Sequence, residues 1–249
     1  MYSNKSLLLA TDLDGTFLEG SERERTSFYQ YVQANRDHIL LVFVTGREIS
    51  RIRSLYADPN FPKPDYVIAD VGTTIVHGKT FEPITVIQDW VAQKWKNANQ
   101  RVKDLLANES GIELQLVKTE RYVSYCYQPA LLQPSTLAKI TAAGFDYILS
   151  ADTFLDVMPR GVAKGATLLK LIEAMRFDPN SAIVCGDTLN DLSLFETGLK
   201  GIAVKNSEPK LIRKTQTMEN VYHSPYCGVM GIWDGLNVYI KQVALTDAQ

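Results

Sequence analysis

Two pairs of aspartates follow apolar runs at opposite ends of the chain. The run Leu7–Ala10 is typical of a short buried strand, and the "DGT" behind it is typical of a turn, so Asp12 and Asp14 are expected at a strand end. Asp187 and Asp191 follow a second apolar run, in "CGDTLND". Parallel α/β sheets bind their ligands outside the carboxyl ends of their strands. The sequence therefore predicts four carboxylates at one ligand-binding edge.

These four carboxylates need a partner of opposite charge. Without one they would repel each other, raise one another's pKa values and destabilise the fold, and a divalent cation would neutralise them. Ligand sets made only of oxygen favour Mg²⁺. Thr45 and Gly46 follow the apolar run at residues 39–44, and Lys164 begins a later helix. A hydroxyl and a lysine charge suit phosphoryl oxygens, so the residues predict a magnesium-dependent phosphate site.

Each feature has a simpler explanation when it is taken alone. Two aspartates separated by one residue are common in turns and caps, Thr-Gly is common in turns, and a lysine at a helix start is usually solvated. Asp187 and Asp191 could cap the helix that follows them. All of the features together, in order and at predicted strand ends, favour catalysis.

The surrounding elements alternate between helices and buried strands. Residues 21–35 begin with a capping serine and continue with helical spacing, and residues 39–44, "ILLVFV", form a continuous apolar run. A second helix carries Ile49, Ile52 and Leu55, and residues 66–69 form a third buried run. This alternation predicts a doubly wound parallel sheet.

A different pattern interrupts the alternation between residues 81 and 159. Its predicted elements are a long amphipathic helix at 89–108, two alternating strands at 112–117 and 121–127, a helix at 137–144, and two more strands at 146–151 and 153–159. The order αββαββ predicts an α+β module. After residue 159 buried strands and helices resume, so we expect a core domain of 1–80 and 160–249 with an inserted domain of 81–159.

The motifs "DLDGT", "VTGR", a lysine ahead of a helix and "GDTLND" resemble, in order and spacing, those of the haloacid dehalogenase (HAD) superfamily of phosphatases. The match spans nearly the whole chain. The inserted module resembles the C2 cap of the Cof-like and sucrose-phosphate phosphatase group. Segments such as "YVIADVGTTIV" and "LFETGLKGIAVKNSEPKL" are similar to the sucrose-phosphate phosphatase subfamily. The resemblance implies a Rossmann-like core, a substrate-specificity cap and phosphate monoester hydrolysis.

The resemblance also implies catalytic roles. Asp12 would be the nucleophile that forms an aspartyl-phosphate, and Asp14 would be the general acid that protonates the leaving group and then the base that activates water. Thr45 would hydrogen-bond the transferring phosphoryl group. Lys164 would offset the charge of that group and of Asp12.

Metal and substrate contacts follow from the same resemblance. The implied Mg²⁺ ligands are Asp12, the backbone carbonyl of Asp14, Asp187 and Asp191. Arg47 could hold a neighbouring carboxylate or be solvated. The substrate contacts, with cap residues chosen by their place in strands and turns, are Thr45, Gly46, Arg47, Lys164, Asn190, Tyr125, Ser150 and Asp152, and Arg160 could also face the cleft.

The predicted substrate is a sugar phosphate, in first place a disaccharide phosphate, with sucrose 6-phosphate leading a set that includes mannosylfructose phosphate and other glycosyl phosphates. Gly15, Thr188 and Leu189 depart from the subfamily, which often has asparagine, serine and glycine there. These departures leave the exact sugar open. A sugar phosphomutase or phosphotransferase, or a carbohydrate-phosphate binding protein without activity, remains an alternative.

Composition limits the other partners. The chain has 249 residues, 45% of them hydrophobic, and a formal net charge of −2, so no basic field favours nucleic acid or membrane surfaces. Three scattered cysteines fit reduced core residues better than disulfides, and no apolar run approaches signal-peptide or membrane-spanning length. We expect a soluble cytoplasmic enzyme, monomeric unless it oligomerises through a surface that the sequence does not reveal.

Overall fold

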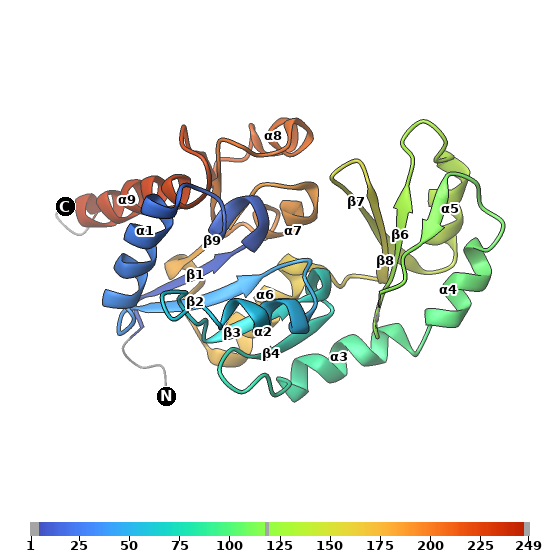
Figure 1. The fold of residues 1–249 in the computed structure, drawn as a ribbon, viewed down its shortest axis with the longest axis horizontal. Coiled ribbons are helices and arrows are strands. Elements are labelled where there is room, and N and C mark those ends of the chain that lie inside the picture. Colours follow the sequence, from blue (N-terminus) through green and yellow to red (C-terminus); the bar gives the residue numbers. More distant parts are fainter. Residues whose placement is uncertain (1–4, 118–119, 247–249) are drawn as a thin grey trace.

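The computed structural model describes residues 5–117 and 120–246 and contains two separate β-sheets (Figure 1). The larger sheet has seven strands in the order β11-β10-β9-β1-β2-β3-β4, and the smaller has four in the order β5-β6-β8-β7. The smaller sheet lies within the chain between β4 and α6. The prediction of an α/β core with an inserted α+β module is confirmed.

The large sheet is parallel except at one edge, where β4 runs antiparallel to β3. Its strands are β1 (Leu7–Thr11), β2 (Ile39–Val44), β3 (Tyr66–Ala69), β4 (Thr74–His77), β9 (Ala182–Gly186), β10 (Lys200–Ala203) and β11 (Val221–His223). The strands β1, β2, β3 and β9 are buried almost throughout, as expected where helices cover both faces of a sheet.

Helices cover both faces of this sheet. Adjacent residues of β1 alternate between two hydrophobic clusters: Leu9 packs with residues of α1 and α9, whereas Leu8 packs with residues of α6. A capping box at Ser21 and Glu24 begins α1. The helices of the core are α1 (Glu22–Ala34), α2 (Ile49–Leu55), α6 (Lys164–Met175), α7 (Leu192–Phe195), α8 (Pro209–Thr215) and α9 (Gly228–Thr246), with short turns η1 (Leu13–Phe17), η2 (Asp70–Gly72), η3 (Pro179–Ser181) and η4 (Leu189–Asp191).

The small sheet is antiparallel and has its own hydrophobic core. In Figure 1, α4 and α5 lie on the side of this sheet that faces away from the large sheet. The other face of the small sheet is turned toward the core. Its elements are α3 (Thr85–Trp95), α4 (Asn99–Leu106), β5 (Ile112–Leu114), β6 (Val123–Tyr127), α5 (Pro134–Ala142), β7 (Phe145–Ser150) and β8 (Phe154–Pro159).

Two predicted elements differ from the observed ones. The single helix expected at 89–108 is broken, because Lys96 and Asn97 adopt left-handed backbone angles with φ of 53° and 52°. Trp95 before the break and Val102 of α4 after it pack in the same cap cluster. The strand expected at 112–117 ends at Leu114, and Leu116 beyond it is exposed rather than packed on the sheet.

Helix α3 lies within the predicted inserted domain, yet Ile87 near its start packs in a hydrophobic cluster of the large sheet. The division into a core of residues 1–80 and 160–249 and a cap of residues 81–159 stays a proposal. Residues 1–4, 118–119 and 247–249 lie outside the described part of the chain. Cys185 is buried, whereas Cys126 and Cys227 are exposed, so the expectation of core cysteines holds for Cys185 alone. Among the described residues, no helix is both long and apolar enough to cross a membrane.

Candidate active site

Parallel pairing of β1 with β9 brings the first aspartates of both motifs together. Thr11 pairs with Cys185, and the backbone N–H of Asp12 donates to the carbonyl of Cys185 at 2.9 Å. Carboxylate oxygens of Asp12, Asp187 and Asp191 all lie within 4.8 Å of one another, and all three residues are buried. The predicted clustering of these carboxylates is therefore present in the fold.

The turn after Asp12 is shaped to contact Asp187. Gly15 has a φ of +76°, and a Cβ at this position would lie 2.1 Å from Oδ2 of Asp187. Only glycine accommodates both the backbone angle and this approach without displacing the carboxylate. Thr16 then donates from Oγ1 to Oδ1 of Asp187 at 2.8 Å. The "DGT" turn thus fixes the orientation of Asp187.

Lys164 lies at the centre of the cluster and has no exposed surface. Its Nζ donates to Oδ1 of Asp12 at 2.7 Å, to Oδ1 of Asn190 at 2.6 Å and to Oδ1 of Asp191 at 2.6 Å. An ammonium group has three donors, so all of them are used. Oδ2 of Asp191 accepts the backbone N–H of Asp187 at 3.0 Å, which ties the lysine network to the loop.

One lysine does not neutralise three buried carboxylates. Burial raises the pKa of Asp12 to about 7, with Lys164 opposing the shift and Asp191 adding to it. Burial also raises the pKa of Asp187 to about 8, with further repulsion from Asp191 and Asp12. Burial and mutual repulsion thus disfavour the charged forms of these carboxyls, and a divalent cation such as Mg²⁺, which prefers hard oxygen ligands, would stabilise them.

Asp14 lies outside this buried cluster. Its side chain is 61% exposed, and both of its carboxylate oxygens accept hydrogen bonds from Arg47, from Nε at 2.7 Å and from Nη2 at 2.5 Å. Of the two interpretations of Arg47, the structure supports the one in which it holds a carboxylate. Thr45 is fully buried, and its Oγ1 accepts the backbone N–H of Arg47 at 3.1 Å.

A cavity of about 450 Å³ separates this cluster from the cap. Its core side includes Asp12, Asp14, Gly46, Arg47 and Asn190. Ser150, a predicted cap contact, also lines the cavity. Six of the residues that were expected to meet the substrate or the reacting groups therefore face one space.

The cap contributes polar residues that the sequence analysis missed. Ser124 and Asp156 face each other on β6 and β8, and Oγ of Ser124 donates to Oδ1 of Asp156 at 2.5 Å. Asp156 is 6% exposed, and burial raises its pKa to about 6. Gln115 also lines the cavity, and its buried Nε2 has no hydrogen-bond partner among the described residues. We call Gln115, Ser124, Ser150 and Asp156 the cap wall.

Three predicted cap contacts lie elsewhere. Tyr125 packs in the hydrophobic core of the cap, because residues 123, 125 and 127 share the inner face and residue 124 faces the cavity. Asp152 is exposed and forms an ion pair with Lys210 of the core. Arg160 donates to the carbonyl of Thr141 at 2.8 Å. None of these three side chains lines the cavity, and the expectation that they contact the substrate stays a prediction.

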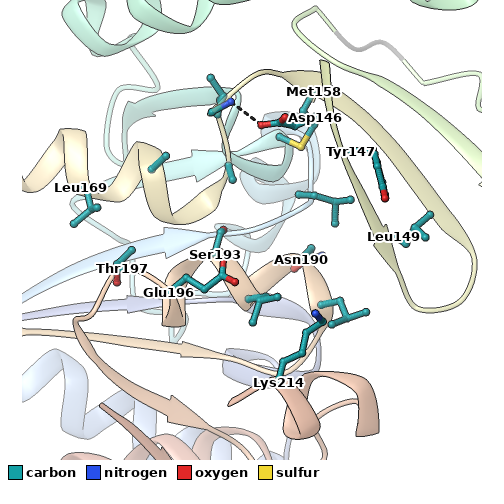
Figure 2. Close-up of a pocket in the computed structure, with 17 residues that line it drawn as sticks. Asp146, Tyr147, Leu149, Met158, Leu169, Asn190, Ser193, Glu196, Thr197 and Lys214 are labelled. Atoms are coloured by element: carbon teal, nitrogen blue, oxygen red, sulfur yellow. Dashed lines mark hydrogen bonds between the residues drawn. The ribbon is translucent and has the colours of Figure 1, made fainter. Parts of the chain in front are cut away.

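A larger groove of about 690 Å³ lies beside the cavity, between β7 and the helices α6 and α7 (Figure 2). Asn190 lines both spaces. Tyr147, Leu149 and Met158 form much of the cap side in Figure 2, and Glu196 and Lys214 lie on the core side. None of the three clustered aspartates lines this groove, so the chemistry belongs to the smaller cavity.

Several known proteins are similar to the chain over most of its length. It is 39% identical over 227 residues to a glucosylglycerol-phosphate synthase of Pseudomonas anguilliseptica, covering 91% of this chain and 30% of that protein. It is 29% identical over 241 residues to a mannosylfructose-phosphate phosphatase of Agrobacterium fabrum, covering 92% and 95%. It is also 29% identical to a tobacco sucrose-phosphatase, of which it spans 52%. The chain is thus much shorter than some of these relatives.

Solved structures share the fold. A sucrose-phosphatase of Synechocystis superposes with a TM-score of 0.85 at 23% identity, covering 94% of this chain and 98% of the other. A haloacid dehalogenase-like hydrolase of Bacillus subtilis gives a TM-score of 0.66 at 17% identity, covering 95% and 93%. The protein-family model described as "Sucrose-6F-phosphate phosphohydrolase" matches residues 5–240. With its HAD core and C2 cap, the chain belongs to the sucrose-6F-phosphate phosphohydrolase family.

Proposed function

We propose that the chain is a Mg²⁺-dependent phosphatase that hydrolyses a phosphorylated glycoside through an aspartyl-phosphate. The observation that carries this proposal is the position of the buried cluster of Asp12, Asp187, Asp191 and Lys164, beside a cavity of about 450 Å³ that a polar cap wall closes. A phosphoryl group placed there would meet a nucleophile, a lysine charge and the candidate metal ligands together.

The first step transfers the phosphoryl group to Asp12. A carboxylate oxygen of Asp12 bonds to phosphorus while the bond from phosphorus to the leaving-group oxygen breaks. Lys164, 2.7 Å from Oδ1 of Asp12, orients this carboxylate and offsets the charge that gathers around phosphorus. Asp14, at the cavity side of the same turn, donates a proton to the departing alkoxide.

The second step returns the enzyme to its starting state. A water oxygen attacks phosphorus, the bond to Asp12 breaks, and Asp14 accepts the proton that the water loses. Inorganic phosphate then leaves. Asp187, Asp191, Asp12 and the backbone carbonyl of Asp14 would hold Mg²⁺. When bound, this ion neutralises charge on the phosphoryl oxygens.

The cap wall supports a hydroxyl-rich leaving group. A sugar hydroxyl can donate to Asp156 and accept from Nε2 of Gln115, which has no partner among the described residues. The names of the relatives, which include glucosylglycerol-phosphate synthase, mannosylfructose-phosphate phosphatase and sucrose-phosphatase, share a phosphorylated glycoside. A cavity of about 450 Å³ has the size of small-ligand sites.

A phosphate-release screen tests this function. The purified chain with Mg²⁺ is offered sucrose 6-phosphate, mannosylfructose phosphate, glucosylglycerol phosphate, glucose 6-phosphate, fructose 6-phosphate and a nucleotide, and Asp12→Asn is the control for contaminating activity. We expect kcat/KM for at least one of the three glycoside phosphates to exceed kcat/KM for the two hexose phosphates and the nucleotide by about a hundredfold. Highest activity on nucleotides would contradict the glycoside, and transfer of the phosphoryl group to an added sugar without phosphate release would indicate a phosphotransferase.

A further inference from the structure

Glu208 lies just before α8, yet its carboxylate makes no capping hydrogen bond to that helix. Its Oε2 accepts the backbone N–H of Leu189 at 3.0 Å, and its Oε1 accepts the backbone N–H of Ala151 at 2.8 Å. Its own backbone N–H donates to the carbonyl of Asp187 at 2.8 Å. One side chain therefore joins the loop that carries Asp187 and Asp191 to the turn between β7 and β8 of the cap.

The cap turn that Glu208 binds is strained. Ala151 and Asp152 have φ angles of 51° and 47°, and the N–H of Thr153 donates to the carbonyl of Ser150 at 3.1 Å. Two consecutive left-handed residues favour Asn-Gly, and side chains with a Cβ are unfavourable there. Such backbone persists where surrounding contacts hold it. Asp152 adds a second contact to the core, because it forms an ion pair with Lys210 of α8.

Both ends of the Glu208 bridge adjoin residues of the cavity. Ser150, which precedes Ala151, lines the cavity from the cap. Asn190, which follows Leu189, lines it from the core and accepts from Nζ of Lys164 at 2.6 Å. A carboxylate that binds two backbone N–H groups makes strong hydrogen bonds, and loss of the carboxylate leaves both N–H groups without their charged acceptor.

We propose that Glu208 is a positioning residue that makes docking of the cap turn and the geometry of the 187–191 loop depend on each other. It acts through Leu189 and Ala151 rather than on the substrate. With the turn docked, both oxygens of Glu208 are engaged and the loop holds Asn190 against Lys164. With the turn released, one oxygen is free and the loop loses part of its anchor. The kinetic readouts rest on the proposed phosphatase function, whereas the binding geometry does not.

Amide hydrogen exchange tests the bridge without any substrate. Glu208→Ala should speed exchange of the Ala151 and Leu189 amides by about tenfold or more, because both lose their acceptor. Lys210→Ala removes the ion pair with Asp152 but leaves the carboxylate of Glu208, so it should speed exchange at Ala151 and, through the released turn, to a smaller extent at Leu189. Glu219→Ala, an exposed glutamate beyond the same helix, is the matched control and should change neither amide. Unchanged exchange at Leu189 in Glu208→Ala would overturn the proposal.

Kinetics separate positioning from simple stability. Glu208→Ala should lower kcat by about tenfold and raise the Mg²⁺ concentration for half-maximal activity, because the loop that carries Asp187 and Asp191 is loosened. Lys210→Ala should raise KM for the glycoside phosphate and raise the Mg²⁺ requirement less than Glu208→Ala does. Glu208→Gln preserves the shape of the side chain, so its kcat and Mg²⁺ requirement should fall between those of the wild type and Glu208→Ala. A lower Tm with an unchanged Mg²⁺ requirement in both Glu208 variants would make Glu208 merely structural, and absence of wild-type hydrolysis would instead refute the phosphatase proposal.

Discussion

Arg47 holds both carboxylate oxygens of Asp14 in a two-pronged hydrogen bond, with distances of 2.7 Å and 2.5 Å. The backbone N–H of Arg47 is itself held by the buried Thr45 at 3.1 Å. The "VTGR" segment therefore positions the carboxylate of the "DLDGT" segment. This pairing places Asp14 beside the cavity and away from the buried aspartates.

The first prediction concerns the two hydrogen bonds from Arg47 to Asp14. Arg47→Lys keeps the charge but not the two parallel donors, so Asp14 should lose its fixed orientation. We expect kcat on the glycoside phosphate to fall by about tenfold or more, with a smaller loss on an aryl phosphate whose leaving group needs no proton. Steady-state kinetics on both substrates measure the difference. Equal losses would show that Arg47 binds the phosphoryl group instead of orienting Asp14.

The second prediction separates the two aspartates of the first motif. Asp12→Asn should retain the fold and reduce kcat by at least about a thousandfold on every substrate, because an amide is a poor nucleophile. Asp14→Asn should retain much of the activity on the aryl phosphate. Acid-quench trapping of labelled phosphate on the protein measures the intermediate. Labelled aspartyl-phosphate that still forms in Asp12→Asn would remove Asp12 from that role.

The third prediction is a dependence of stability on pH and Mg²⁺. Asp12 and Asp187 have pKa values raised to about 7 and about 8 by burial, from an ordinary value of 3.8. A carboxyl with a raised pKa binds more protons in the folded than in the unfolded state, so the folded state is destabilised as pH rises through this window. The Tm of chelator-treated protein should therefore fall between about pH 5 and about pH 8.

Mg²⁺ should reverse this loss, because it binds the deprotonated carboxylates. The rise in Tm on adding Mg²⁺ should be larger at about pH 8 than at about pH 6. Asp187→Asn removes one charge, so it should flatten the pH dependence of the metal-free protein and reduce the Mg²⁺ effect. A Tm that rises with pH in the metal-free protein would contradict the electrostatic account of the cluster.

The core of the site is predictable because local sequence determines where its strands end. An apolar run before Asp12 and another before Asp187 set those ends, and parallel pairing of the two strands then places the carboxylates side by side. Lys164 follows from its place at the start of α6, although its three acceptors do not. No local pattern indicates the edge strand β4 or the bridge made by Glu208, because both depend on contacts distant in sequence.

The cap residues that face the cavity are less predictable, because alternate residues of a strand point to opposite faces and the sequence must show which set points to the cavity. In "RYVSYCY" aromatic residues occupy both faces, and tyrosine suits either a core or a polar surface, so the sequence does not decide between Ser124 and Tyr125. Packing decides it, because Tyr125 fills the cap core. The break at Lys96 and Asn97 likewise lacks glycine or proline, so no local pattern indicates it, although Trp95 before it and Val102 after it pack in the same cap core.

The last prediction tests Asp156 of the cap wall. Asp156→Asn keeps the shape but replaces a two-oxygen acceptor with one acceptor and one donor, so a sugar hydroxyl that donates to Asp156 loses its partner. We expect kcat/KM on the preferred glycoside phosphate to fall by about tenfold or more, mostly through KM, with activity on an aryl phosphate nearly unchanged. Glu113→Gln, at an exposed position of β5 in the same sheet, is the matched control.

Acidity should reproduce this effect in the wild type. Because burial raises the pKa of Asp156 to about 6, its carboxylate gains a proton as pH falls through that value. A protonated Asp156 accepts fewer hydrogen bonds from the sugar, so KM for the glycoside phosphate should rise below about pH 6 while KM for the aryl phosphate does not follow it. In Asp156→Asn, the pH dependence of KM should be the same for the glycoside phosphate and the aryl phosphate. If the difference persists in that variant, a group other than Asp156 reads the sugar.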